Sequence, residues 1–353
     1  MRHVSSLDEL LASTAALVTE DHTPACQVAV ARDGALLAFE TFGAATNDSR
    51  FCVFSATKPI VASAVWLLIG DGSVDPAQRV VDLVPEFTGH GKDVITVEQV
   101  LLHTSGFPNA ALDFAAGAVP AQRRAAFATW ELEWEPGTRF EYHALSAHWV
   151  LVDIIERVTG RDFRDVIEDR VSAPLGLPRL LGIPEDRQGD VIDAAPVGAW
   201  VESDIDILGL ANDPDARAAG VPGGGGIMSA ATMAGFYQGV LRNPGGLWDA
   251  GVLADATTKI RCRFEDPLMH VPVNRTLGLV VAGDDGMHQL RYAMFGAACS
   301  PGAYGHAGAF SQVAWADPAT GTSFALLKNG CNADLIADAV NIMPLTDLAS
   351  RLD

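Results

Sequence analysis

The chain has 353 residues, of which 49% are hydrophobic and 19% charged, and its formal net charge is −20. A chain of this size can bury a large core, so we expect one large domain or two closely packed ones. The acidic balance argues against nucleic acid as a partner, because phosphate binding needs a basic face. The five cysteines are scattered without a CxxC pair, which predicts reduced, mostly buried thiols in a cytoplasmic protein.

Acidic residues interrupt the apolar pattern of the N-terminal segment, which reads MRHVSSLDELLASTAALVTED. Leu7, Leu10, Leu11 and Leu17 fit one face of an amphipathic helix better than the unbroken apolar core of a signal peptide. The longest apolar run, residues 60–70, is far shorter than a membrane span requires. We therefore expect an N-terminal helix and no membrane partner.

The next segments change from strand to helix patterns. Residues 26–43 read CQVAVARDGALLAFETFG, two alternating apolar runs joined by Arg-Asp-Gly, which predicts a β-hairpin. A helix follows from Ser55 to about Gly70, and the pattern then stays mostly helical, broken by Pro and Gly turns, to about residue 270. Residues 146–160 are the clearest helix, with a serine at the start and a glycine at the end.

The last quarter of the chain returns to strand patterns. Short apolar runs at residues 276–283, 310–317 and 323–330 are bounded by turn residues, and residues 333–352 predict a final helix. Because strands occur at both ends of the sequence with helices between them, we expect one sheet built from the two termini. The middle of the chain is then a mostly helical insertion packed beside that sheet.

Ser55 and Lys58 lie three residues apart in the segment FCVFSATKPI, at the start of the predicted helix. Residues at this spacing share a helix face with their Cβ atoms about 5–6 Å apart, so the lysine can reach the serine hydroxyl. Pro59 has no N–H for a helical hydrogen bond, so the helix must begin close to Ser55, where backbone N–H groups favour negative charge. The pair fits a nucleophile and its base if the lysine pKa is lowered from about 10.4. A helix cap and a surface lysine would give the same pattern.

Two other segments carry residues suited to the same chemistry. Tyr142 follows a Pro-Gly turn in WEPGTRFEYHALSAHWV, a position for a side chain that projects from a loop end. His306, Ala307 and Gly308 lie on an apparent strand among small residues, where a ligand can approach the backbone closely. Taken alone, each of these residues is as well explained by a structural role.

Taken in chain order, the S-x-x-K pair, the tyrosine and H-x-G on a C-terminal strand resemble the serine β-lactamase-like superfamily, in particular class C β-lactamases and family VIII esterases. Residues 97–108, 134–143, 221–241 and 305–330 resemble further segments of that family. The resemblance therefore covers essentially the whole chain.

The resemblance implies an α+β, β-lactamase-like fold. An antiparallel sheet from both chain termini is flanked by helices, and a mostly helical domain is inserted beside it. We expect residues 1–59 and 275–353 to form the discontinuous α/β domain and residues 60–274 the helical one. The active site is expected at the interface of the two domains.

The resemblance also implies roles for individual residues. Ser55 is the expected acyl-forming nucleophile, and Lys58 its proton acceptor or electrostatic partner. Tyr142 is expected to share the base role, with its phenol held toward the phenolate by Lys58. The backbone N–H groups of Ser55 and Ala309 are the expected oxyanion hole. Which group deprotonates Ser55 stays open at this point.

Two positions depart from the family pattern. The family's Y-x-N is here Tyr142-His143-Ala144, which loses an amide that grips β-lactams and peptides. Its K-T-G is here His306-Ala307-Gly308, which exchanges a permanent cation for a group that titrates near ~6.5. Both changes favour an uncharged acyl substrate over a carboxylate-bearing one.

Substrate contacts are expected from His306, Gly308 and Trp134, which borders the site. The sequence has no HExxH motif and no acidic-histidine cluster, so we expect no catalytic metal, and no cofactor motif is present. The turn PGGGG at residues 222–226 lacks the Lys-Ser/Thr of a phosphate loop and predicts a tight turn that lines the cleft.

The interpretation that fits best is a serine hydrolase of the carboxylesterase type, cleaving a small ester through an acyl-Ser55 intermediate. Acyl transfer from the same intermediate and β-lactamase or amidase activity are the alternatives. A non-catalytic binding protein on this scaffold is a further one. The sequence does not indicate an oligomeric state or the acyl and alcohol groups of the substrate.

Overall fold

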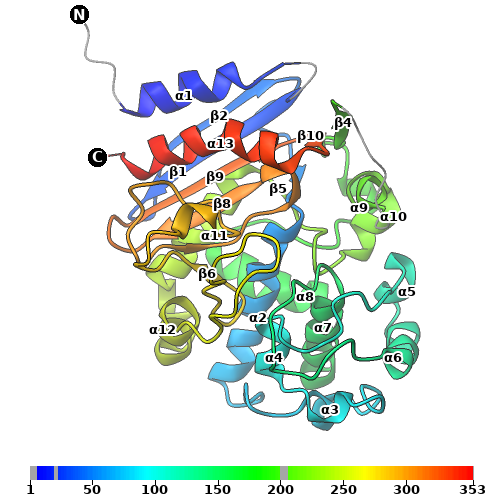
Figure 1. Cartoon of the computed structure of the whole chain (residues 1–353). Helices are drawn as coiled ribbons and strands as arrows, with labels where there is room; N and C mark the ends of the chain where they lie inside the picture. The colour runs from blue at the N-terminus through cyan, green and yellow to red at the C-terminus, as the bar shows by residue number, and fades with distance from the viewer. Residues whose placement is uncertain (1–5, 20–22, 199–205, 353) are drawn as a thin grey trace, which may run out of the picture.

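A computed structural model of the chain describes residues 6–19, 23–198 and 206–352. Its main sheet has six strands, all paired antiparallel, in the order β2-β1-β9-β8-β7-β6 (Figure 1). These strands are β1 (Ala25–Arg32), β2 (Ala35–Gly43), β6 (Val280–Val281), β7 (Tyr304–Gly305), β8 (Val313–Asp317) and β9 (Thr322–Lys328). The predicted α+β sheet built from both chain termini is confirmed.

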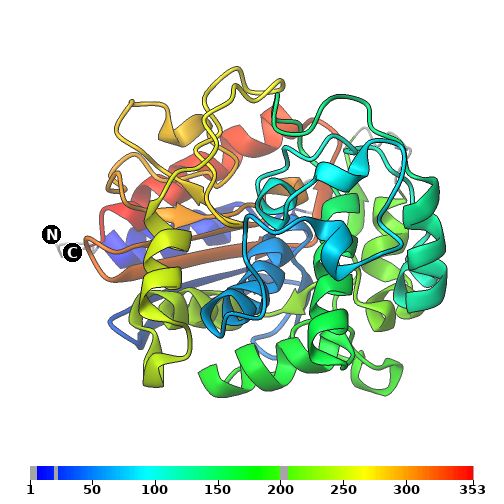
Figure 2. The ribbon, with the colours of Figure 1, turned by 90° about the horizontal axis from the view of Figure 1, so that it is seen from below.

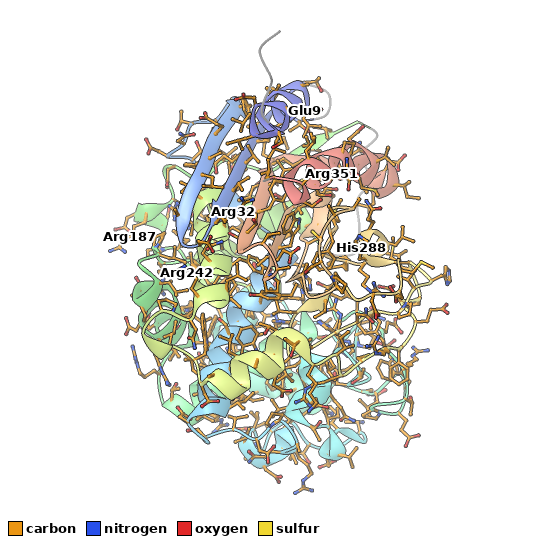
Figure 3. All side chains as sticks on the ribbon, turned by 90° about the vertical axis from the view of Figure 1, so that its left-hand side faces the viewer. Glu9, Arg32, Arg187, Arg242, His288 and Arg351 are labelled. Carbon is orange, nitrogen blue, oxygen red and sulfur yellow. The ribbon has the colours of Figure 1, made fainter. Side chains whose placement is uncertain are left out.

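The two ends of the chain meet at the pair β1 and β9, whose register runs from Cys26 opposite Lys328 to Arg32 opposite Thr322. Arg32, labelled in Figure 3, strengthens this junction by donating a hydrogen bond of 3.0 Å to the Thr322 hydroxyl and another to the carbonyl of Leu352. The predicted hairpin also forms, because Asp33 and Gly34 adopt the positive φ angles that a two-residue turn requires.

Helices cover both faces of the sheet. On one face lie α1 (Ser6–Ala16) and α13 (Leu335–Ser350), and on the other lies α11 (Ala230–Arg242) (Figure 1). Strand β1 alternates accordingly, since Val28 and Val30 pack in the cluster that includes α1 and α13, while Ala29 and Ala31 pack in the cluster that includes α11. The predicted N-terminal and C-terminal helices are both present; α13 is a few residues shorter than the predicted 333–352, and residues 1–5 and 20–21 of the predicted N-terminal segment lie outside the described residues.

The middle of the chain is mostly helical, as predicted. Two of its long helices, α2 (Lys58–Gly70) and α7 (Ser146–Thr159), pack against each other. The others are α3 (Val80–Leu83), α4 (Val97–Leu101), α5 (Phe114–Ala118), α6 (Pro120–Thr129), α8 (Phe163–Ile167), α9 (Ile207–Asn212), α10 (Pro214–Ala219) and α12 (Ala250–Thr258). The short strands β3 (Phe51–Cys52), β4 (Ala195–Val197), β5 (Ile227–Met228) and β10 (Gly330–Asn332) form two small sheets, β3 with β5 and β4 with β10.

Helix α2 lies near the centre of the molecule, where it packs against α7 and α12 (Figure 2). It is apolar on all sides, and every residue from Lys58 to Leu68 is buried. Trp66 on this helix donates a hydrogen bond of 2.7 Å to the carbonyl of Leu277, which fixes the helix against the segment that leads into β6. The predicted nucleophile therefore lies at the end of the most buried helix. The exact domain boundaries stay a prediction.

Candidate active site

Ser55 is the first residue of a 3-10 turn, Ser55–Thr57, that runs directly into α2. The turn is clamped to the Gly-rich segment that precedes β5. The Thr57 hydroxyl donates to the Phe54 carbonyl at 2.6 Å and accepts from the N–H of Gly226 at 2.8 Å. A Cβ at Gly226 would lie 2.6 Å from the Thr57 hydroxyl oxygen, so only glycine fits there. The PGGGG turn thus holds the backbone beside Ser55.

The Lys58 side chain is buried and ends beside the Ser55 hydroxyl. Its Nζ atom lies 3.1 Å from the Ser55 Oγ, 2.7 Å from the Ala144 carbonyl oxygen and 2.6 Å from the Gly223 carbonyl oxygen. Burial and the positive charge of Arg275 hold the Lys58 pKa well below its ordinary value. A neutral amine is therefore the favoured form of this side chain.

The three contacts of Lys58 satisfy the three N–H groups of an ammonium ion, and they suit a neutral amine equally well. Such an amine has two N–H groups and one lone pair. With the N–H groups donated to the carbonyls of Ala144 and Gly223, the lone pair is left to accept the Ser55 proton. This geometry can deprotonate Ser55 as the hydroxyl attacks an acyl carbon. The surface-lysine alternative raised by the sequence is excluded, because Lys58 is only 1% exposed.

The Tyr142 ring lies on the same side of the site, at the end of the loop that precedes α7. The Lys58 Nζ is 4.9 Å from its ring centroid, and the guanidinium of Arg275 is 5.2 Å from it. The ring of His103 stacks on it at a centroid distance of 4.8 Å. The Tyr142 hydroxyl is buried without a well-formed hydrogen bond, although the Ser55 and Tyr292 hydroxyls are near enough to affect its pKa.

The expected phenolate at Tyr142 is not supported. Burial, together with the neighbouring Tyr292, raises the Tyr142 pKa well above its ordinary value, and this outweighs the opposite effect of Arg275. The phenol therefore keeps its proton near neutral pH. Of the two candidate bases that the sequence left open, Lys58 is favoured by its local environment.

His143, which replaces the middle residue of the family's Y-x-N, points away from the site. Its Nε2 accepts a hydrogen bond of 3.2 Å from the N–H of Phe107 and lies 3.1 Å from the Ser105 hydroxyl, while its Nδ1 faces the Glu141 carbonyl at 2.7 Å. The imidazole thus holds the HTSGF turn together. The next residue, Ala144, has no amide side chain and contributes its carbonyl to Lys58 instead.

His306 is fully buried and neutral, so the expectation that it titrates near ~6.5 is wrong. Its Nε2 lies 3.4 Å from Nη1 of Arg275, and its Nδ1 faces the Ala307 carbonyl at 2.7 Å. Burial and the Arg275 charge hold its pKa well below the ordinary value. Arg275, a permanent cation that is only 2% exposed, was not predicted as part of the site. The one available sign was its position directly before the apolar run 276–283.

Gly308 brings the strand segment after β7 against the nucleophile's backbone. A Cβ at this position would lie 2.2 Å from the Val53 carbonyl oxygen, so a glycine is required by close approach rather than by a positive φ. Within the described residues, no hydrogen bond from the N–H of Ser55 or of Ala309 is recorded. Both N–H groups are available to an oxyanion.

Backbone strain accompanies both of these N–H groups. Phe54, directly before Ser55, has a φ of 45°, and Phe310 and Ser311, directly after Ala309, have φ values of 56° and 58°. Such values cost about 1–3 kcal/mol each for residues other than glycine and gather at functional sites. The rings of Phe54 and Phe310 pack edge to face at 5.4 Å, which links the two strained segments.

A cavity of about 790 Å³ opens beside Tyr142 and extends between α5, α9 and α10. The residues that line it include Tyr142, Ala144, Leu145 and four aspartates; none of the described lining residues is basic. Neither Ser55 nor Trp134 is among the lining residues, so the expectation that Trp134 borders the site stays a prediction. Its ring instead contacts His143 at 6.1 Å and lies under the guanidinium of Arg139.

The described residues contain neither a candidate metal cluster nor a candidate membrane-spanning helix. Among these residues, no group of three or more His, Cys, Asp or Glu side chains has the geometry to hold a metal ion. No helix in the same part of the chain is both long and apolar enough to cross a membrane.

Comparison with known proteins agrees with this geometry. The esterase/beta-lactamase LipL of Mycobacterium tuberculosis is 27% identical over 82% of this chain and 71% of its own length. A putative D-alanyl-D-alanine carboxypeptidase of Escherichia coli is 26% identical over 81% of this chain and 70% of its own length. The crystal structure of a family VIII carboxylesterase superposes with a TM-score of 0.82 at 22% identity, covering 100% of this chain and 99% of that one.

Residues 10–343 match the Beta-lactamase family, which is nearly the whole chain. The resemblance suggested by the S-x-x-K pair, the tyrosine and H-x-G is therefore confirmed. The chain belongs to the β-lactamase family.

Proposed function

We propose that this protein is a serine hydrolase that cleaves small carboxylic esters through an acyl-Ser55 intermediate. The observation that carries the proposal is the buried Lys58, whose Nζ lies 3.1 Å from the Ser55 Oγ and whose other hydrogen-bond partners are two backbone carbonyls. An acidic or exposed environment would keep the lysine protonated. Here burial and the positive charge of Arg275 lower the Lys58 pKa and so favour loss of its proton.

In the proposed reaction, Ser55 Oγ forms a bond to the acyl carbon while its proton passes to Lys58. The carbonyl oxygen becomes negative and is bound by the N–H groups of Ser55 and Ala309, donors that are typically worth about 3–4 kcal/mol each. The bond to the alcohol then breaks, and the alcohol leaves with a proton. Water repeats the sequence on the acyl-enzyme, releases the acid and restores Ser55 and Lys58.

Charge around the cavity supports a neutral ester rather than an anionic substrate. Asp113, Asp206, Asp213 and Asp215 line it, and the permanent cation Arg275 is buried outside its lining. A substrate carboxylate would meet negative charge on entering, without a cation to offset it. The names of two relatives, an esterase/beta-lactamase and a family VIII carboxylesterase, indicate ester cleavage in both of those proteins and also β-lactam cleavage in the first.

The test is covalent labelling combined with turnover. Ser55→Ala is expected to abolish both p-nitrophenyl acetate hydrolysis and labelling by a fluorophosphonate, whereas the control Ser73→Ala, at an exposed loop serine, keeps both. Retained hydrolysis in Ser55→Ala would overturn the mechanism. Absence of any acyl adduct in the wild-type protein would favour the non-catalytic binding protein.

Two enzyme alternatives share the same acyl-enzyme and are separated by product analysis. An amide-cleaving or β-lactam-cleaving activity, as the name of the Escherichia coli relative suggests for that protein, predicts nitrocefin turnover comparable to ester turnover. Acyl transfer predicts that an added alcohol or amine replaces water and yields a new ester or amide. The acidic cavity favours ester hydrolysis over nitrocefin, which carries a carboxylate.

A further inference from the structure

A second tyrosine, Tyr292, brings its hydroxyl close to the hydroxyls of Ser55 and Tyr142. It lies in the connection between β6 and β7, far from Tyr142 in the sequence. Its ring centroid is 5.0 Å from that of Tyr142 and 5.2 Å from that of His306, which it meets edge on. No sequence pattern pointed to this position, because the connection between β6 and β7 is largely irregular.

The backbone around Tyr292 is fixed on both sides. Its carbonyl accepts a hydrogen bond of 2.9 Å from the N–H of Ala307, in the middle of the H-x-G segment. The preceding side chain, Arg291, is buried and donates to the carbonyls of Pro272, at 3.0 Å, and of Ala282. The Tyr292 backbone is therefore held by the same segment that carries the predicted oxyanion-hole residue, Ala309. Its ring is held by contacts with Tyr142 and His306.

The hydroxyl of Tyr292 faces the reacting atoms. It lies close enough to the hydroxyls of Ser55 and Tyr142 for both to lower its pKa, and Arg275 acts in the same direction. Burial is the larger effect and leaves the Tyr292 pKa above its ordinary value. Tyr292 is therefore a protonated phenol near neutral pH, with a proton to give at the nucleophile.

The other groups described at Ser55 are engaged elsewhere, so none of them is assigned to protonate the leaving alcohol. Lys58 takes the Ser55 proton, and its two N–H groups are bound to the carbonyls of Ala144 and Gly223. The Ser55 and Ala309 N–H groups face the carbonyl oxygen of the substrate. An alcohol that leaves the acyl carbon needs a proton on its oxygen, and this oxygen departs from the atom that Ser55 attacks.

We propose that Tyr292 is a further catalytic residue, which donates its phenolic proton to the leaving oxygen of the ester. As the bond between the acyl carbon and this oxygen breaks, its electron pair stays on the oxygen, which takes the Tyr292 proton. The resulting phenolate is neutralised by the proton that Lys58 accepted from Ser55, passed across the Tyr142 hydroxyl. The cycle conserves protons and needs no further reactant. This role rests on the proposed ester hydrolysis.

The test uses two acetate esters that differ only in how much the leaving group needs a proton. A p-nitrophenolate leaves without protonation, whereas an alkoxide from a simple alkyl acetate does not. Tyr292→Phe is therefore expected to lower kcat/KM by about 10²–10⁴-fold for the alkyl ester and by less than about threefold for the p-nitrophenyl ester. Tyr304→Phe, which removes a buried phenol hydroxyl from β7, is the matched control and is expected to leave both rates unchanged.

The outcomes separate this role from the proposed function. Equal losses on the two esters, or no loss on either, would overturn the role of Tyr292 while Ser55→Ala remains inactive. Retained hydrolysis of both esters in Ser55→Ala would overturn the proposed function and this role together. A second variant avoids any packing change: 3-fluorotyrosine at position 292 keeps ring and hydroxyl but is more acidic. If Tyr292 donates a proton, the pH above which alkyl-ester activity is lost should be lower in this variant than in the wild-type protein. If Tyr292 only packs beside the site, that pH should not change.

Discussion

Two buried lysines of this chain differ in what their ammonium groups meet. Lys328, at the end of β9, is 1% exposed and donates to the carboxylate of Asp338 at 2.8 Å and to the Gly330 carbonyl at 2.7 Å. Lys58 is equally buried, but its contacts are two carbonyls and a serine hydroxyl. A buried lysine that meets a carboxylate forms a structural ion pair. A buried lysine that meets no carboxylate can instead lose its proton and serve as a base.

Replacing each lysine by methionine tests the comparison directly, and Lys58 should show the largest effect on activity. Lys58→Met removes the proposed base and is expected to lower kcat/KM for p-nitrophenyl acetate by about 10²–10⁴-fold. The protein should still fold, because no carboxylate is left unpaired. Initial rates and circular dichroism measure the two effects, and near wild-type turnover would contradict the role of Lys58.

Lys328→Met should produce the opposite pattern. It leaves the Asp338 carboxylate buried without its cation, so the free energy of unfolding is expected to fall by about 3–5 kcal/mol. The kcat of the folded fraction should stay unchanged, because Lys328 is not part of the proposed site. Urea unfolding followed by fluorescence measures the first effect. A fall in the kcat of the folded Lys328→Met protein, with little change in its free energy of unfolding, would contradict a purely structural role for Lys328.

The strained backbone beside Ser55 predicts a smaller effect. Phe54→Gly removes a buried ring, which lowers the free energy of unfolding. Glycine adopts a φ of 45° without strain, so relief of about 1–3 kcal/mol of backbone strain offsets part of that loss. Phe87, a buried loop residue outside the positive-φ set, is the control. Phe54→Gly should therefore destabilise the protein by about 1–3 kcal/mol less than Phe87→Gly in urea unfolding. Equal losses would mean that Phe54 stores no strain.

The pH dependence should come from Lys58 and not from His306. The Lys58 amine is present above its lowered pKa and is lost as pH falls through it, so kcat/KM falls on the acid side. The unfolded chain binds that proton up to about pH 10.4, so the stability also rises with pH between the two pKa values. His306→Gln should leave the position of the acid limb unchanged, since His306 is neutral throughout. A shifted limb in this variant would contradict that assignment.

The sequence predicted those features that a local pattern encodes. The i,i+3 spacing placed Lys58 beside Ser55, and the apolar periods at the two termini predicted the shared sheet. Gly308 was singled out because a ligand can approach the backbone closely among small residues; the Val53 carbonyl approaches it in the structure, and its contact with substrate stays a prediction.

The rest depends on contacts between distant segments. Arg275 and Tyr292 reach the site from irregular connections, and neither position has a periodicity that could point to it. The burial of His306 follows from packing against Arg275, so its ordinary pKa was a poor guide. The place of Trp134 at the substrate site stays a prediction, because nearness in sequence to Tyr142 does not fix which way a loop side chain points.

The proton on Lys58 is the most direct test of the account. The sequence contains only four lysines, at positions 58, 92, 259 and 328, so the Nζ signals of a protein labelled with ¹⁵N-lysine can be assigned by single substitutions. The account predicts that the Lys58 signal is that of a neutral amine at a pH where an ordinary lysine is still an ammonium ion. A Lys58 signal that stays that of an ammonium up to about pH 10 would contradict the assignment of Lys58 as the base for Ser55.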